Sequence, residues 1–179
     1  MSHIAMGGKV VTIFQGEFHV SDDPGAVINT LLGSCIAVCL HEPQRRIGGM
    51  NHFLLPEGQG GSTSPDVKQG AHAMELLIND MIKRGAMRSK LTAKVFGAGR
   101  ITQRFSYVSE ANIAFVRQFL RAENIPCLAE SVGGESARRI RFEPVTGDAR
   151  QMLVPRSDAK EDLRPVRPPP PAANPVELF

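Results

Sequence analysis

One cysteine and one histidine, each in a short apolar segment, have the types and spacing to do chemistry together. Cys35 lies in residues 30–39 (TLLGSCIAVC), and His52 lies in residues 47–56 (IGGMNHFLLP). Apolar runs of this length, interrupted by glycine, predict adjacent buried strands. If those strands are neighbours, a thiol and an imidazole meet, which are the nucleophile and base of a covalent mechanism. The pair therefore predicts a hydrolase that works through a thioester.

The chemistry of such a pair needs three contributions. A thiolate attacks a carbonyl or carboxamide carbon far better than a thiol does, so the imidazole must take the proton. The same imidazole can then protonate the departing amine. The tetrahedral oxyanion needs donors, and the backbone N–H groups around residues 33–35 are candidates for that role.

Each of these residues also has a simpler interpretation. Free cysteine is among the most buried residue types, so Cys35 could be a small core residue, as we expect for Cys39 and Cys127. His52 could be a structural histidine. A zinc site built from Cys35, Cys39, His41 and His52 is a further alternative, but its spacing differs from the paired Cys-x2-Cys ligands of structural zinc sites.

Composition excludes several functional classes. The chain has 179 residues, 42% apolar and 22% charged, with a net charge of +3, one Tyr and no Trp. These values are typical of a globular protein and give little support for nucleic-acid binding. The sequence has no apolar run of roughly 20 residues and no basic, then apolar, leader at its start. We therefore expect a cytoplasmic protein without a disulfide framework, in which at least one of the three cysteines remains a free thiol.

Apolar patterning predicts many strands and two long helices. One helix begins near Val67, after a possible cap at Asp66, and stops before Gly85; the other runs from a cap at Ser109 to Pro126. The predicted strands are 9–14, 16–20, 27–32, 35–41, 47–55, 91–97, 127–131, 138–143 and 150–154.

Two stretches stand apart from these elements. Residues 57–66 predict a glycine-rich loop next to His52. From Pro155 the composition changes, and six of the thirteen prolines lie between 165 and 175. We therefore expect one domain over residues 1–154 and a Pro-rich disordered tail over 155–179.

The segments around the reacting pair resemble a known family. Residues 30–40 (TLLGSCIAVCL) and 48–56 (GGMNHFLLP), with Cys35 and His52 17 positions apart, closely resemble the chemoreceptor glutamine deamidase family, CheD. The resemblance continues through residues 93–99 (AKVFGAG) and on to about residue 154, and it leaves out the Pro-rich tail.

The resemblance implies a fold and a set of site residues. The fold would be α+β, a β-sandwich with helices packed on one side (three layers, α/β/β), similar to cytotoxic necrotizing factor deamidases. Cys35 would be the nucleophile and His52 the general base and acid, with no metal or other cofactor. The family's third catalytic residue is a threonine shortly before the cysteine, which favours Thr30. On a regular strand, however, Asn29 would share a face with Cys35, unless Gly33 introduces a bulge.

The resemblance also implies a function and partners. The enzyme would hydrolyse the side-chain amide of selected glutamines on methyl-accepting chemotaxis receptors, in their cytoplasmic helical domain, to give glutamate. A second possible partner is a CheC phosphatase of the chemotaxis response regulator. The alternative function is therefore a regulatory adaptor that binds and stimulates such a phosphatase.

Overall fold

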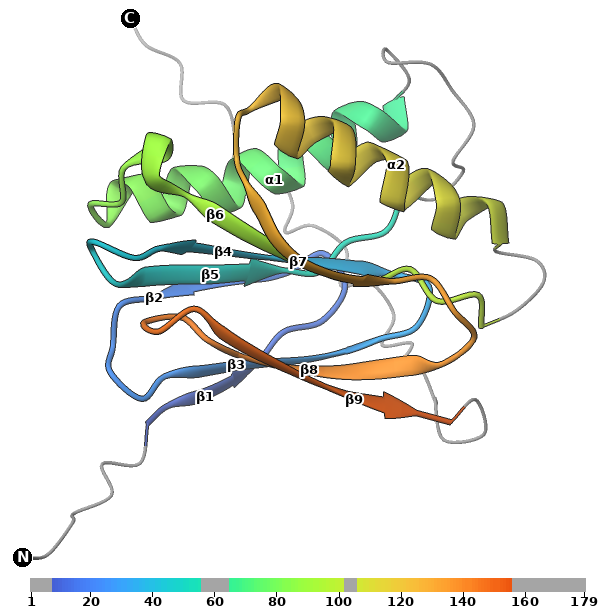
Figure 1. Ribbon diagram of the computed structural model, residues 1–179, viewed down its shortest axis with the longest axis horizontal. Helices are drawn as coiled ribbons and strands as arrows, with labels where there is room; N and C mark the ends of the chain where they lie inside the picture. The colour runs from blue at the N-terminus through green and yellow to red at the C-terminus, as the bar shows by residue number, and fades with distance from the viewer. Residues whose placement is uncertain (1–7, 56–64, 102–105, 156–179) are drawn as a thin grey trace, which may run out of the picture.

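Two mixed β-sheets stack face to face, and two α-helices cover the outer face of one of them (Figure 1). The computed structural model describes residues 8–55, 65–101 and 106–155. Two mixed sheets and two helices confirm the predicted α+β class. The helices form one layer, the five-stranded sheet the next, and the four-stranded sheet the last. This order agrees with the expected packing of the helices on one side. Residues 156–179 of the expected tail and residues 57–64 of the expected loop lie outside the described residues.

The five-stranded sheet is the central layer, and its strand order is β2-β5-β4-β6-β7. Its strands are β2 (Phe18–Ser21), β4 (Ile36–Glu42), β5 (Ile47–Asn51), β6 (Thr92–Gly97) and β7 (Cys127–Val132). Because β4 is buried on both faces, it is a nearly continuous apolar run. Ile36, Val38 and Leu40 face the helices, whereas Ala37 and Cys39 face the other sheet.

The four-stranded sheet forms the outer layer, with the order β1-β3-β8-β9. Its strands are β1 (Val10–Thr12), β3 (Val27–Leu32), β8 (Ala137–Glu143) and β9 (Asp148–Val154). Ile28, Leu32, Ile140 and Phe142 point from it into the apolar layer between the sheets. Consecutive strands β3 and β4 belong to different sheets, so the chain crosses from one sheet to the other at residues 33–35.

The helices α1 (Pro65–Lys83) and α2 (Ser106–Ala122) pack on the five-stranded sheet, and a short 3-10 helix, η1 (Arg88–Lys90), precedes β6. Two predicted caps are wrong. Asp66 lies inside α1, which already begins at Pro65. Ser109 lies inside α2, where it is buried and its Oγ donates to the Gly99 carbonyl at 3.1 Å. A serine can make such a backbone contact from inside a helix as well as at a cap.

Two other expectations also need correction. The strand predicted over 47–55 ends at Asn51, and beyond it only Phe53 makes an isolated bridge, to Ile36. Cys127, expected in the core, is exposed because β7 is the edge strand of its sheet. By contrast, Cys39 is buried as expected, with an exposed fraction of 1%.

Gly97 illustrates how closely the strands approach near Cys35. A Cβ on Gly97 would lie 2.3 Å from the Cys35 carbonyl oxygen, and the residue has φ = +112°. Gly85, with φ = +102°, has the same conformational demand but nothing within 4 Å of such a Cβ. The two positions therefore separate backbone strain from steric overlap.

We predict that Gly85→Ala lowers the free energy of unfolding by about 1 kcal/mol, the cost of a left-handed conformation. Gly97→Ala should lower it by about 3 kcal/mol or more, because overlap with the Cys35 carbonyl adds to that strain. Urea unfolding of both variants measures the two losses. Equal losses would mean that the Cys35 segment moves away from the new Cβ without a measurable cost in stability.

Candidate active site

Cys35 lies where the chain crosses from β3 to β4, and backbone hydrogen bonds fix this crossing. The Cys35 carbonyl accepts from the Ala98 N–H at 2.7 Å, and the Gly33 carbonyl accepts from the Gly99 N–H at 2.9 Å. The Cys35 side chain belongs to the apolar layer between the sheets and is only 6% exposed. The thiol is therefore recessed and held on a rigid backbone.

His52 follows the last residue of β5 and is also 6% exposed. The β4–β5 register, in which Cys39 pairs with Met50, continues to the bridge between Ile36 and Phe53. In this register Cys35 and His52 are diagonal neighbours with side chains on the same face, about 7–8 Å apart between backbones. That spacing lets a long imidazole ring approach the thiol.

A hydrogen bond from the other sheet orients the imidazole. Thr30 Oγ1 lies 2.7 Å from His52 Nδ1 and also 2.7 Å from the carbonyl oxygen of Ile13. A carbonyl can only accept, so the single hydroxyl proton of Thr30 is donated to Ile13. Thr30 must then accept from His52, which places the ring proton on Nδ1. The Nε2 atom is left with its lone pair, which is the form required of a base toward Cys35.

Burial sets the protonation state of this histidine. Desolvation lowers the pKa of His52 from 6.5 to about 4. The imidazole is therefore neutral near pH 7, which is the form that can accept a proton. Once protonated, an imidazole with so low a pKa is a strong acid and gives up its proton readily.

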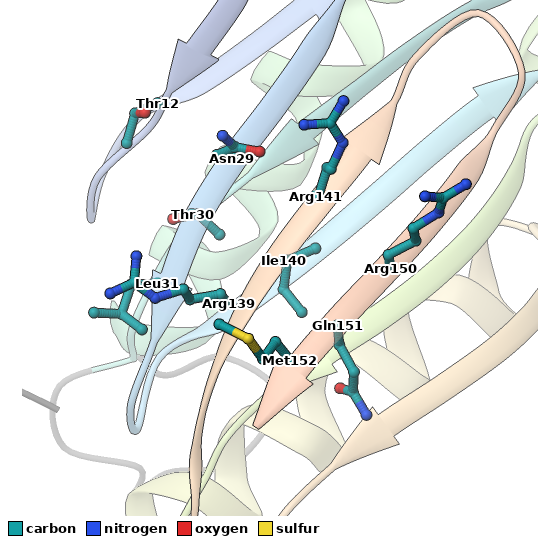
Figure 2. Close-up of a pocket in the computed structure, with 10 residues that line it drawn as sticks. All are labelled: Thr12, Asn29, Thr30, Leu31, Arg139, Ile140, Arg141, Arg150, Gln151 and Met152. Carbon is teal, nitrogen blue, oxygen red and sulfur yellow. The ribbon is translucent and has the colours of Figure 1, made fainter. Parts of the chain in front are cut away.

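The structure brings Thr30, and not Asn29, to His52. Asn29 lies on the outer face of β3, where it pairs with Arg141 and lines a groove of about 410 Å³ (Figure 2). The rule of alternating faces does not apply between residues 29 and 35, because the chain leaves one sheet and enters the other within that segment. Figure 2 shows Asn29 and Arg141 on neighbouring strands, and Arg139 and Arg150 also line this groove.

Two buried asparagines hold the chain on both sides of His52. Asn51 accepts from the Val38 N–H at 3.0 Å, and Asn112 of α2 accepts from the Leu55 N–H at 3.0 Å. Both side chains are at most 2% exposed. Buried amides with satisfied hydrogen bonds fix backbone position strongly, so the segment that carries His52 is tied to β4 and to a helix.

The sequence analysis missed two groups that contact the candidate site residues Thr30 and Cys35. The first is the Ile13 carbonyl, which no side-chain pattern could reveal. The second is Gln15, whose Oε1 accepts from the Cys35 thiol at 3.7 Å. Gln15 and His52 line one cavity of about 170 Å³, and Gln15 precedes Gly16 in a turn. A polar residue beside a turn glycine was the available signal.

The described part of the chain holds no cluster of metal-ligating side chains. Among residues 8–55, 65–101 and 106–155, no three His, Cys, Asp or Glu side chains gather closely enough to bind one. His41, one of the alternative zinc ligands, instead contacts the Val145 carbonyl through Nε2 at 3.1 Å.

Within residues 8–55, 65–101 and 106–155, no helix has the length and apolarity needed to cross a membrane.

Comparison with known proteins identifies the family. A family model described as CheD chemotactic sensory transduction matches residues 54–152. A relative from Caulobacter vibrioides is 49% identical over 173 residues, which cover 94% of this chain and 92% of the relative. The chain belongs to the CheD family. A relative from Agrobacterium fabrum is 47% identical, with 96% of this chain and 97% of the relative covered.

Both relatives carry the name "Probable chemoreceptor glutamine deamidase CheD". The family model's match begins after Cys35 and His52, whereas the two relatives align over nearly the whole chain. Family membership therefore confirms the resemblance noted in the sequence.

Solved structures give only a distant likeness. Neisseria meningitidis protein NMB0706 has a TM-score of 0.47 at 11% identity, covering 72% of this chain and 65% of its own. YlmD from Geobacillus stearothermophilus has a TM-score of 0.40 at 12% identity, covering 70% of this chain and 59% of its own. The expected similarity to cytotoxic necrotizing factor deamidases stays a prediction.

The depressed pKa of His52 makes stability depend on pH. The folded state holds the imidazole neutral down to about pH 4, whereas the unfolded chain protonates it near 6.5. We predict that His52 leaves the free energy of unfolding unaffected above pH 6.5. As pH falls from 6.5 to 4, the neutral buried ring should lower that free energy by an amount on the order of 3 kcal/mol.

A His52→Gln variant isolates that effect, since all other titrating groups are unchanged. Urea unfolding at several pH values between 4 and 7 should show the stability difference between parent and variant changing steadily in favour of the variant as pH falls. A difference that is constant across this range would mean that His52 titrates normally in the folded protein.

Proposed function

We propose that this chain is a protein-glutamine deamidase, a cysteine hydrolase that converts specific glutamines of methyl-accepting chemotaxis receptors to glutamate. The observation that carries the proposal is the buried contact of His52 Nδ1 with Thr30 Oγ1 at 2.7 Å, in a strand register that places His52 on the same face as the recessed Cys35. The relatives' shared name, chemoreceptor glutamine deamidase, supports the reaction and the class of substrate.

In the first half of the reaction, His52 Nε2 takes the proton from Cys35 as the sulfur attacks the carboxamide carbon. A C–S bond forms, and the electron pair of the C=O bond moves to oxygen as an oxyanion. When the oxyanion collapses, the C–N bond breaks and His52 gives its proton to the leaving nitrogen. Ammonia departs and a thioester remains.

In the second half, water attacks the thioester after giving a proton to His52. The C–S bond breaks, the sulfur takes the proton back from His52, and the substrate leaves as a carboxylic acid, which ionises to glutamate. Water and a carboxamide have been converted to ammonia and a carboxylic acid, whose proton passes to solvent or to ammonia, and no oxidant is consumed. Thr30 keeps its contact with Nδ1 throughout and so preserves the orientation of the ring.

The recess favours a side chain as the reacting group. Cys35 and His52 are each only 6% exposed, so a flexible glutamine side chain can reach them whereas a folded backbone cannot. Receptor glutamines on the surface of a helical domain present that side chain. We propose that the protein acts in the cytoplasm, where this receptor domain lies.

The test is peptide mass spectrometry of a cognate receptor domain incubated with the protein. We expect the parent to convert specific glutamines to glutamate, a mass gain of about one dalton per site, and Cys35→Ala and His52→Ala to convert none. If the parent converts none on a folded receptor, the deamidase proposal fails. The adaptor role would then be tested with Cys35→Ala and a CheC-type phosphatase, since binding does not need the thiol.

A matched pair of variants tests the role of Thr30. Thr30→Ser keeps the hydroxyl and should retain most of the activity, whereas Thr30→Val, which has nearly the same shape, should lower kcat about 100-fold because the ring loses its fixed tautomer and orientation. The rates come from the same mass-spectrometric assay, with unfolding midpoints measured beside them. Equal rates for the two variants would contradict an orienting role for the hydroxyl.

A further inference from the structure

A glutamine of the chain itself lies at the nucleophile, and it has no place in the mechanism above. Gln15 Oε1 accepts a hydrogen bond from the Cys35 thiol at 3.7 Å. The residue is exposed and lines the same cavity of about 170 Å³ as His52. Its carboxamide therefore lies within hydrogen-bonding reach of the Cys35 sulfur and at the cavity that His52 lines.

The backbone of Gln15 is fixed relative to His52. Residues 14–17 form a tight turn in which the Glu17 N–H donates to the Phe14 carbonyl at 3.0 Å, and Gly16 has φ = +86°, as a type II turn requires. The Gly16 N–H donates to the His52 carbonyl at 2.8 Å, and the His52 N–H donates to the Glu17 carbonyl at 3.0 Å. The turn and the base therefore form one rigid unit.

A carboxamide can serve both protonation states of the sulfur. The thiol has a proton to donate, and Gln15 Oε1 accepts it. The thiolate can only accept, and a half-turn about the last side-chain torsion brings the NH2 group of Gln15 toward it. That torsion is broad and two-fold, and the side chain is exposed, so the rotation meets little resistance.

We propose that Gln15 is a catalytic residue that donates from its Nε2 to the negative charge as it forms on Cys35 and passes to the substrate oxygen. The proposal rests on the deamidase function and adds a side-chain donor to its oxyanion site. Gln15 changes no covalent bond. It stabilises charge that exists only after His52 has taken the proton.

The surroundings explain why a neutral donor is useful at this position. The titratable groups around the cavity are Glu17, His52 and His72. The Glu17 carboxylate already accepts from the Phe14 N–H at 2.9 Å, so it is held in the turn beside Gln15. A carboxylate there opposes a second negative charge on Cys35, and His52 is neutral in the resting state. An amide donor offsets that repulsion without adding a group that titrates.

The first experiment follows the alkylation of Cys35 by iodoacetamide across pH, with peptide mass spectrometry to separate it from the exposed Cys127. Gln15→Glu has the same shape but no donor, and Gln15→Met has neither donor nor acceptor. Gln118→Glu adds the same charge on the exposed face of α2 and serves as the control.

We expect Gln15→Glu to raise the pH midpoint of alkylation by about one unit or more, because a nearby like charge opposes the thiolate. Gln15→Met should raise it by a smaller amount, and Gln118→Glu should leave it unchanged. An unchanged midpoint in Gln15→Glu, or an equal shift in the control, would overturn the proposal.

The second experiment measures deamidation kinetics on the receptor domain. A donor that acts on developing charge affects kcat, so we expect both Gln15 variants to lower kcat about 10-fold or more while KM changes less than about threefold. Parent-like rates in both variants would overturn the role of Gln15. A parent that converts no glutamine would overturn the deamidase function instead, and the alkylation shift, which needs no receptor, would still test Gln15.

Discussion

The hydrogen bond from His52 to Thr30 is the interaction on which the candidate site depends, because it joins side chains of the two sheets. Thr30 belongs to the four-stranded sheet, while His52 extends from the five-stranded one. The bond is short and buried, and the Thr30 proton is committed to the Ile13 carbonyl. The orientation of the His52 ring is therefore a consequence of how the sheets pack. A shift of one sheet relative to the other would move the Nε2 atom.

The same packing explains how a polar pair persists in an apolar layer. Leu32, Met50 and Phe142 fill the space between the sheets, and water has little access to Cys35. A charged imidazole would be costly there, which is why the pKa of His52 is low and the resting imidazole is neutral. In the proposed mechanism charge forms only transiently, when the thiol reacts, and hydrogen-bond donors must then already be in place.

Sequence patterning was sufficient for much of this architecture. Apolar runs located β3 at its observed bounds and both helices to within a few residues, because each element buries a regular stripe or face. Sequence patterning was wrong about helix ends and sheet edges. Ser109 and Asp66 were predicted to be helix caps but lie inside helices. Cys127 was predicted to lie in the core but is exposed on an edge strand. Helix ends and sheet edges are decided by tertiary contacts that a single sequence does not display.

The candidate site shows the same division. Cys35 and His52 could be found from residue type and context, but the choice between Asn29 and Thr30 could not, because alternation along a strand assumes that the strand stays in one sheet. Thr30 shares the inner face of β3 with Ile28 and Leu32, and the crossing at residues 33–35 turns Cys35 toward the same layer from the other sheet. The crossing is also what recesses Cys35. A single topological feature thus places Thr30 opposite His52 and recesses Cys35, so the geometry of the candidate site depends on how the two sheets stack.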